Sequence, residues 1–244
     1  MVPLLYPVYQ PIVDLRTGEP LHYEALARVA LDTSGVAHGP LIELAERFRF
    51  IPALDLSIAS QVLETARIHA AHVAINLSPV TIETATQQLL EQLDVEATLA
   101  CRLTIEITEQ QPIQDLGLLL DFLEIVRGRH ISVALDDFGR GCFTEPLVRR
   151  IQPDFLKIDG SLLERSVRGH GSEELRRAVD LVAGFGGRLI AEFVDSPRKA
   201  IHLGTMGIHY AQGSLFGMPS AALPDDQPPP VMRVCVTALQ EDAS

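Results

Sequence analysis

Six segments of the sequence are apolar, strand-like runs that end in a carboxylate, a carboxamide or an ammonium group. The oxygens of carboxylates and carboxamides bind hard divalent cations, which prefer such ligands and activate water for attack on phosphate esters. A single apolar run that ends in Asp is uninformative, but six in one chain indicate an acidic ring at one mouth of a barrel. The residues at the ends of the runs are Glu24, Asn76, Glu106, Asp136 with Asp137, Lys157 and Glu192.

The residue types in this ring predict a site for two metal ions. Two ions that act together on a phosphodiester lie roughly 3.5–4 Å apart and need a bridging carboxylate, for which Asp136 is our candidate. The carboxamide oxygen of Asn76 is a neutral ligand that keeps the site from becoming too anionic for a phosphate. The other ligands divide between the ions, with Glu24, Asn76 and Glu106 at one and Asp137 and Glu192 at the other.

Lys157 is the only basic residue in the ring. Among carboxylates it should stay paired and charged, and it could hold a metal-bridged water or help to deprotonate it. Because the ions lower the pKa of that water, a strong protein base is unnecessary. Gln212, at the end of the last strand-like run, could orient the water or a ligand oxygen. Each residue alone could be a helix cap, a surface charge or a structural ion pair, so the hypothesis depends on their combination.

Eight strand-like runs must position these residues, and helical patterns separate most of them. This alternation predicts an α/β fold, either a closed (β/α)8 TIM-like barrel or a doubly wound sheet. In a barrel, active sites lie at the C-terminal ends of the strands, where the acidic residues fall. The strand-like runs lie near residues 5–13, 20–27, 72–77, 102–108, 131–137, 154–159, 188–194 and 208–213. The helical patterns cover 39–48, 52–69, 81–93, 113–129, 172–185 and 197–205.

Two segments depart from the simple alternation. Only a short turn, residues 14–20, joins the first two strand-like runs, so we expect a hairpin and one antiparallel strand in the barrel. We assign residues 1–221 to the barrel domain and 222–244 to a C-terminal tail. Residues 225–230 have the composition of an extended linker, and residues 231–239 either continue that tail or pack back as a short strand.

Composition narrows the class of protein and its partners. The length of 244 residues suits one barrel, which typically needs about 250. A net charge of −12 without a visible basic face argues against a nucleic-acid polymer as partner. The three cysteines have no paired spacing, which favours a reducing compartment. Since neither a signal peptide nor a membrane-spanning run is evident, we expect a cytoplasmic protein without a membrane partner.

The order of the motifs resembles the EAL domain family, the bacterial phosphodiesterases of cyclic di-GMP. The resemblance runs from about Tyr9 to Pro219. Any one motif is weak, but the whole set occurs in the family order with matching separations. The motifs are Glu24-Ala25-Leu26 with Arg28, Ile75-Asn76-Leu77-Ser78-Pro79, Glu106-Ile107-Thr108-Glu109, Asp136-Asp137-Phe138-Gly139, Lys157-Ile158-Asp159, Ala191-Glu192 and Gln212-Gly213.

The resemblance implies a barrel with one antiparallel strand that hydrolyses cyclic di-GMP to linear pGpG with Mg²⁺ or Mn²⁺. It implies that Lys157 contacts the attacking water and that Gln212 supports the site. Arg28 would reach a substrate phosphate, and Gln10, Leu26 and Asp159 would line the nucleotide path. A homodimer is a further expectation of the family. The implied metal ligands are Glu24, Asn76, Glu106, Asp136, Asp137 and Glu192.

The departures from the family pattern surround these ligands without replacing them. Residues 140–146 differ from the usual loop, Phe193 stands where the family usually has Gly, and Ser214 and Val29 replace aromatic residues. Changes around metal ligands typically cost 10–100-fold in metal affinity or activity. We therefore expect a phosphodiesterase of full or attenuated activity. The alternatives are a non-catalytic receptor or protein-binding regulator of the same fold, and a barrel enzyme with one Mg²⁺ and a lysine base.

Overall fold

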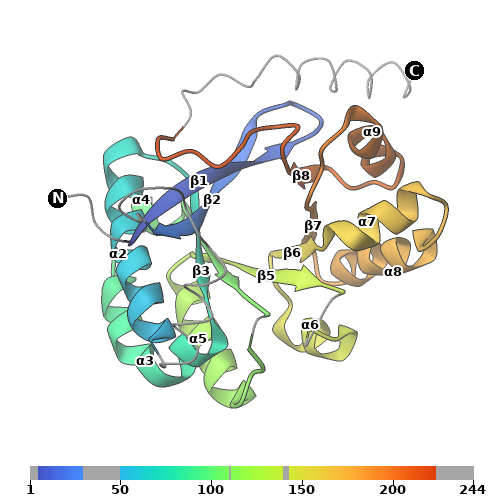
Figure 1. The fold of residues 1–244 in the computed structure, drawn as a ribbon. Helices are drawn as coiled ribbons and strands as arrows, with labels where there is room; N and C mark the ends of the chain where they lie inside the picture. The colour runs from blue at the N-terminus through green and yellow to red at the C-terminus, as the bar shows by residue number, and fades with distance from the viewer. Residues whose placement is uncertain (1–4, 30–49, 110, 140–142, 224–244) are drawn as a thin grey trace.

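Eight strands close into a barrel in the computed structural model, which describes residues 5–29, 50–109, 111–139 and 143–223. The runs rich in Val, Ile and Leu form strands buried on both faces, as expected when helices cover a parallel sheet. Figure 1 looks into the barrel, with the helices arranged around it. The strands are β1 (Leu5–Asp14), β2 (Pro20–Val29), β3 (Val73–Leu77), β4 (Leu103–Ile107), β5 (Ser132–Phe138), β6 (Phe155–Ile158), β7 (Arg188–Ala191) and β8 (Tyr210–Gln212).

The topology confirms the TIM-like barrel and excludes the doubly wound sheet. Strand β1 is antiparallel to both β2 and β8, whereas neighbours from β2 to β8 are parallel. The β1–β2 turn is short, and the amide of Asp14 donates to the carbonyl of Glu19 at 2.9 Å. After β8 the chain runs back alongside β1, where Tyr9 and Ser220 exchange two backbone hydrogen bonds.

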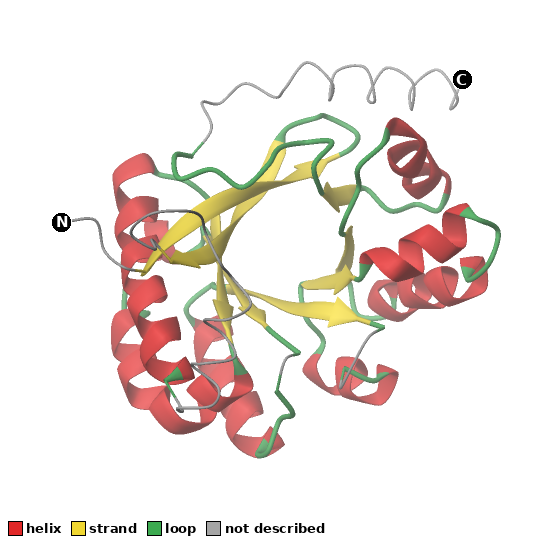
Figure 2. Cartoon of the chain, in the orientation of Figure 1, coloured by secondary structure: helices red, strands yellow, loops and turns green. Residues whose placement is uncertain are grey.

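Eight helices are described around the barrel (Figure 2). Five of them match predicted helical patterns, whereas α4, α6 and α7 were missed because four to eight residues carry too little periodicity. The pattern at residues 39–48 and the proposed strand at 231–239 lie outside the described residues. The helices are α2 (Ile51–His69), α3 (Pro79–Gln92), α4 (Ala97–Ala100), α5 (Leu116–Gly128), α6 (Glu145–Ile151), α7 (Gly160–Val167), α8 (Ser172–Ala183) and α9 (Pro197–Thr205).

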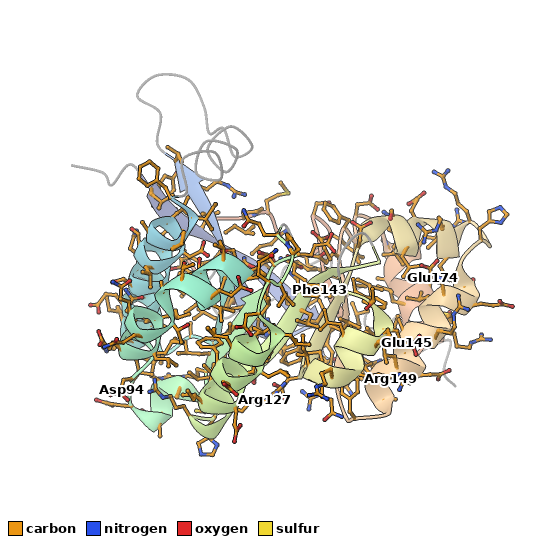
Figure 3. All side chains as sticks on the ribbon, turned by 90° about the horizontal axis from the view of Figure 1, so that it is seen from below. Asp94, Arg127, Phe143, Glu145, Arg149 and Glu174 are labelled. Carbon is orange, nitrogen blue, oxygen red and sulfur yellow. The ribbon has the colours of Figure 1, made fainter. Side chains whose placement is uncertain are left out.

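The outer layer is held by apolar packing and by hydrogen bonds between neighbouring helix ends. Phe122 and Val126 of α5 are fully buried against the outer faces of the strands. At the end of α5, Arg127 donates to the carbonyls of Ile151 and Gln152, both at 2.8 Å, and so ties α5 to the end of α6 (Figure 3). In the described part of the chain, no helix has both the length and the hydropathy that a membrane crossing requires.

A buried carboxylate fixes the segment between β3 and α3, which carries Asn76. One oxygen of Asp55, on α2, accepts from the backbone amide and hydroxyl of Ser78 at 2.9 and 2.8 Å, and from the hydroxyl of Thr81 at 2.5 Å. Burial raises the pKa of Asp55, and these three donors only partly offset the increase. Because Ser78 lies two residues after Asn76, the cluster positions the end of β3.

We predict that Asp55→Ala lowers the free energy of unfolding by roughly 2–4 kcal/mol, since it leaves buried donors without an acceptor. Chemical denaturation would measure the change. The matched control is Asp121→Ala, at an exposed position on α5, which should stay within about 0.5 kcal/mol of the parent. A loss at Asp55 no larger than the control would show that the cluster does not hold this segment.

Candidate metal centre

A buried lysine lies at the centre of four carboxylates in the barrel mouth. The Nζ atom of Lys157, on β6, is 3.1 Å from Glu24, 3.0 Å from Glu106, 3.0 Å from Asp136 and 3.1 Å from Glu192. These residues come from five different strands or the residue that follows one, and Glu24 lies in the middle of β2. They point inward because side chains alternate along a strand. An ammonium has three hydrogens, so it cannot bond all four at once. The well-aligned hydrogen bond goes to Oε2 of Glu106.

The charges of Lys157 and Glu106 stabilise each other. Burial favours the neutral lysine, but the surrounding carboxylates outweigh it and raise the pKa of Lys157 well above its usual value. Burial also disfavours ionised Glu106, but Lys157 and His22 more than compensate and lower the pKa of Glu106 below its usual value. Lys157 and Glu106 therefore form a buried ion pair at neutral pH.

The remaining carboxylates lack sufficient positive charge. Burial raises the pKa of Asp136 to about 7, because the attraction of Lys157 is offset by the neighbouring carboxylates. Burial likewise raises the pKa of Glu192 well above its usual value. One ammonium is too little charge for this many acids, and a bound divalent cation would supply what is missing.

The acidic side chains form two overlapping sets that could each hold a metal ion. Within each set, one carboxylate oxygen per residue lies within 4.8 Å of the others. Asp136 belongs to both sets, which is the arrangement that a bridging ligand requires. One set is Glu24, Glu106 and Asp136, and the other is Asp136, Asp137 and Glu192.

Two carboxamides complete the ring with oxygens that have no hydrogen-bond partner among the described residues. The amide nitrogen of Asn76 donates to Glu24 at 2.9 Å, which leaves its buried Oδ1 without a donor. Gln212 donates to Glu24 at 2.6 Å and to Gln10 at 3.3 Å, and its Oε1 is likewise unpartnered. A buried polar atom without a partner is costly, so the Asn76 oxygen fits the role of a neutral metal ligand.

The local backbone explains how two adjacent aspartates reach one site. Consecutive side chains on a regular strand point to opposite faces. Here the pairing of β5 with β6 shifts register between Leu135 and Phe138, and Asp137 has a positive φ of 56°. The irregularity turns Asp137 towards the same mouth as Asp136. Non-glycine residues in this conformation are strained and cluster at functional sites.

A cavity of about 670 Å³ opens above the ring, and we call it the mouth cavity. Three residues expected to contact a nucleotide line it, namely Gln10, Leu26 and Arg28. The fourth, Asp159, is buried outside this lining, where it caps α7 by accepting from the amide of Ser161 at 2.9 Å. The contact between Asp159 and substrate stays a prediction. Other lining residues are Glu24, Asp136, Asp137, Glu192, Phe193, Asp195, Gln212, Gly213, Ser214, Met218 and Pro219.

Phe193 forms part of the wall of the mouth cavity. The residue is 63% exposed, its φ is 55°, and it packs on Gly160 at the start of α7. Lys199 of α9 donates to the Phe193 carbonyl at 3.1 Å and forms an ion pair with Asp195 at 3.0 Å. Neither Gly160 nor Lys199 was predicted from the sequence as part of the site. Only the four-residue spacing of Asp195 and Lys199 could have indicated part of this arrangement.

We predict that Gly160→Ala destabilises the protein by roughly 1–3 kcal/mol, as overpacking does. A Cβ at position 160 would lie 2.6 Å from the Phe193 Cβ, closer than real contacts allow. Thermal or chemical unfolding would measure the cost. In the double variant with Phe193→Gly the penalty should largely vanish, because the two sites are in contact. Equal costs of Gly160→Ala in both backgrounds would refute the packing described.

With this geometry established, comparison with known proteins places the chain in a family. The family model described as the EAL domain matches residues 4–219. The chain therefore belongs to the EAL domain family, which confirms the resemblance of its motifs.

Among curated proteins, the chain is 29% identical over 232 residues to the cyclic di-GMP phosphodiesterase PdeB of Shewanella oneidensis. It is also 29% identical over 222 residues to the cyclic di-GMP phosphodiesterase NbdA of Pseudomonas aeruginosa. These matches cover 88% and 86% of this chain but only 26% and 28% of the two relatives. The chain thus spans about a quarter of their length.

Solved structures share the fold. The Bacillus subtilis YkuI protein, with an EAL domain in complex with cyclic di-GMP and calcium, superposes with a TM-score of 0.79 at 22% identity. That match covers 98% of this chain and 60% of YkuI. Klebsiella pneumoniae BlrP1, in a complex with manganese and cyclic di-GMP, gives a TM-score of 0.76 at 25% identity, over 90% of this chain and 57% of BlrP1.

Proposed function

We propose that this protein hydrolyses one phosphodiester bond of cyclic di-GMP to give linear pGpG, with two Mg²⁺ or Mn²⁺ ions. The observation that carries the proposal is the position of Asp136 in both acidic sets, beside the buried Lys157. The named activity of the relatives and the metal and nucleotide in the solved EAL structures support it.

The metal ions would be held by the two acidic sets and the free oxygen of Asn76. When bound, such ions lower the pKa of a coordinated water and neutralise developing charge on the phosphate. Lys157 keeps its proton, so it acts as a hydrogen-bond donor that holds the attacking water rather than as a base. Gln212 keeps Glu24 in place through its 2.6 Å hydrogen bond.

Substrate binding would use the mouth cavity above these groups. Arg28 lies on its wall, where a guanidinium suits a phosphate oxygen. Leu26 and Phe193 supply apolar surface for the nucleotide, and Gln10 supplies a carboxamide next to Gln212. The cavity walls thus offer cationic, apolar and hydrogen-bonding groups to one phosphorylated ligand.

The lysine-base alternative fits this site poorly. Lysine can abstract a proton only as the neutral amine, so its ammonium form must first lose a proton readily. The carboxylates around Lys157 raise its pKa well above the usual value, so they oppose that role. The observation favours phosphoryl chemistry over proton abstraction next to a carboxylate.

Incubation with cyclic di-GMP and Mn²⁺, followed by chromatography, should show linear pGpG. Glu24→Ala should lower kcat/KM by more than the roughly 10–100-fold typical of residues that only orient a ligand, since it removes a proposed ligand and a Lys157 contact. Glu64→Ala, which affects an exposed ion pair on α2, is the control and should stay within about twofold.

Two outcomes would count against the enzyme. Binding of cyclic di-GMP and Mn²⁺ by the wild-type protein without any product would favour the non-catalytic receptor. Product formation at an unchanged rate in Glu24→Ala would place the reaction elsewhere.

A further inference from the structure

A histidine lies inside the barrel directly beneath the acidic ring. His22 is on β2, two residues before Glu24, and only 4% of it is exposed. Its Nε2 atom lies 3.6 Å from Oε1 of Glu106, slightly beyond hydrogen-bonding distance. Both atoms are buried, and neither has a hydrogen-bond partner in the described part of the chain. A small movement of either side chain would therefore form a hydrogen bond between these two atoms.

The surroundings of His22 leave few other partners for its ring. Residues two positions from the ring of strand-end groups also point inward, because side chains alternate along each strand. Apart from His22, the described strands contribute only two hydroxyl groups to this lower layer, among methyl, alkyl and phenyl groups. Its other members are Ile12, Ala74, Thr104, Ala134, Phe155, Ile190 and Tyr210. A polar ring nitrogen is costly here unless it is hydrogen-bonded.

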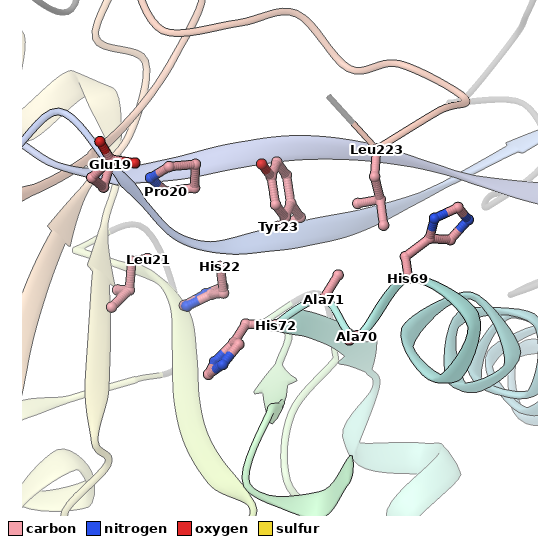
Figure 4. Close-up of a pocket in the computed structure, with 10 residues that line it drawn as sticks. All are labelled: Glu19, Pro20, Leu21, His22, Tyr23, His69, Ala70, Ala71, His72 and Leu223. Carbon is pink, nitrogen blue, oxygen red and sulfur yellow. The ribbon is translucent and has the colours of Figure 1, made fainter. Parts of the chain in front are cut away.

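Two neighbours orient the imidazole towards Glu106. The ring of Phe155 meets it edge to face, with centroids 5.5 Å apart and planes at 64°. Strand β3, between β2 and β4, contributes the small Ala74, which leaves room for the ring to extend towards β4. On its other side, His22 lines a cavity of about 490 Å³ together with His72 (Figure 4). That cavity lies among residues at the start of β2 and the end of α2, away from the carboxylate ring.

We propose that His22 is a positioning residue of the metal centre, whose Nε2–H donates to Oε1 of Glu106. Lys157 already binds Oε2 of Glu106 at 3.0 Å, so the second contact would fix the carboxylate plane from both oxygens. A fixed plane keeps Glu106 oriented for a cation beside Asp136, as outer partners of metal ligands commonly do. The inference rests on the proposed function, because it takes Glu106 as a metal ligand.

A packing role for His22 predicts different behaviour, and two substitutions separate the roles. His22→Phe keeps an aromatic ring against Phe155 but removes the donor. His22→Gln removes the ring but places an amide nitrogen the same number of bonds from Cβ as the imidazole Nε2. If positioning matters, Gln preserves metal binding and Phe does not, whereas a packing role gives the opposite order.

The test is the Mn²⁺ affinity of the full chain, measured without substrate by the electron paramagnetic resonance signal of free Mn²⁺. We expect His22→Phe to weaken binding about 10–100-fold and His22→Gln to stay within about threefold of the wild type. His72→Phe is the matched control, since His72 lines the 490 Å³ cavity together with His22 but is exposed. This variant should bind Mn²⁺ like the wild type. Wild-type affinity in His22→Phe, or equal losses in both His22 variants, would overturn the inference.

A second readout needs neither metal nor a His22 variant. Nitrogen-15 NMR of the metal-free protein should show a protonated His22 Nε2 whose signal shifts in Glu106→Gln. An unchanged signal would overturn the inference even if the metal is bound elsewhere. A wild-type protein that binds no Mn²⁺ but shows the shift would instead refute the proposed function and retain the contact.

Discussion

The upper half of the barrel depends on one interaction, the burial of the Lys157 ammonium among four carboxylates. Each buried charge alone would cost several kcal/mol in lost hydration. Together, the distances of 3.0–3.1 Å from Nζ to Glu24, Glu106, Asp136 and Glu192 make the burial tolerable. The arrangement joins five strands at one point and still leaves excess negative charge. That excess negative charge suits the binding of divalent cations.

Backbone strain lies next to this centre on both sides. Asp137 follows Asp136, the proposed shared ligand, and Phe193 follows Glu192. Both Asp137 and Phe193 have positive φ angles. Conformations of this kind cost of order 1–3 kcal/mol each and persist only where the surrounding structure enforces them. The register shift in β5 enforces the first, and the Lys199 hydrogen bond and Gly160 packing hold the second. The closed barrel thus offsets the free-energy cost of two strained backbone conformations. One directs the Asp137 side chain to the proposed metal site, and the other places Phe193 in the cavity wall.

The sequence could predict whatever depends on local patterns. Apolar runs located all eight strands, the short turn at 14–20 predicted the antiparallel β1, and charged strand ends predicted which side chains meet. Contacts across the barrel leave no such pattern. His22 and Glu106 are 84 positions apart, and Gly160 meets Phe193 only because β7 lies beside β6. The short helix α7 was likewise invisible, so the capping role of Asp159 became evident only in the fold.

A crystal structure with Mn²⁺, in which anomalous scattering locates the ions, would test the proposed metal centre most directly. We expect two peaks in the barrel mouth, roughly 3.5–4 Å apart, with the Asp136 carboxylate between them. Glu106 and the oxygen of Asn76 should contact one ion, and Asp137 and Glu192 the other. A single peak, or ions that do not contact Asp136, would contradict the proposed metal centre.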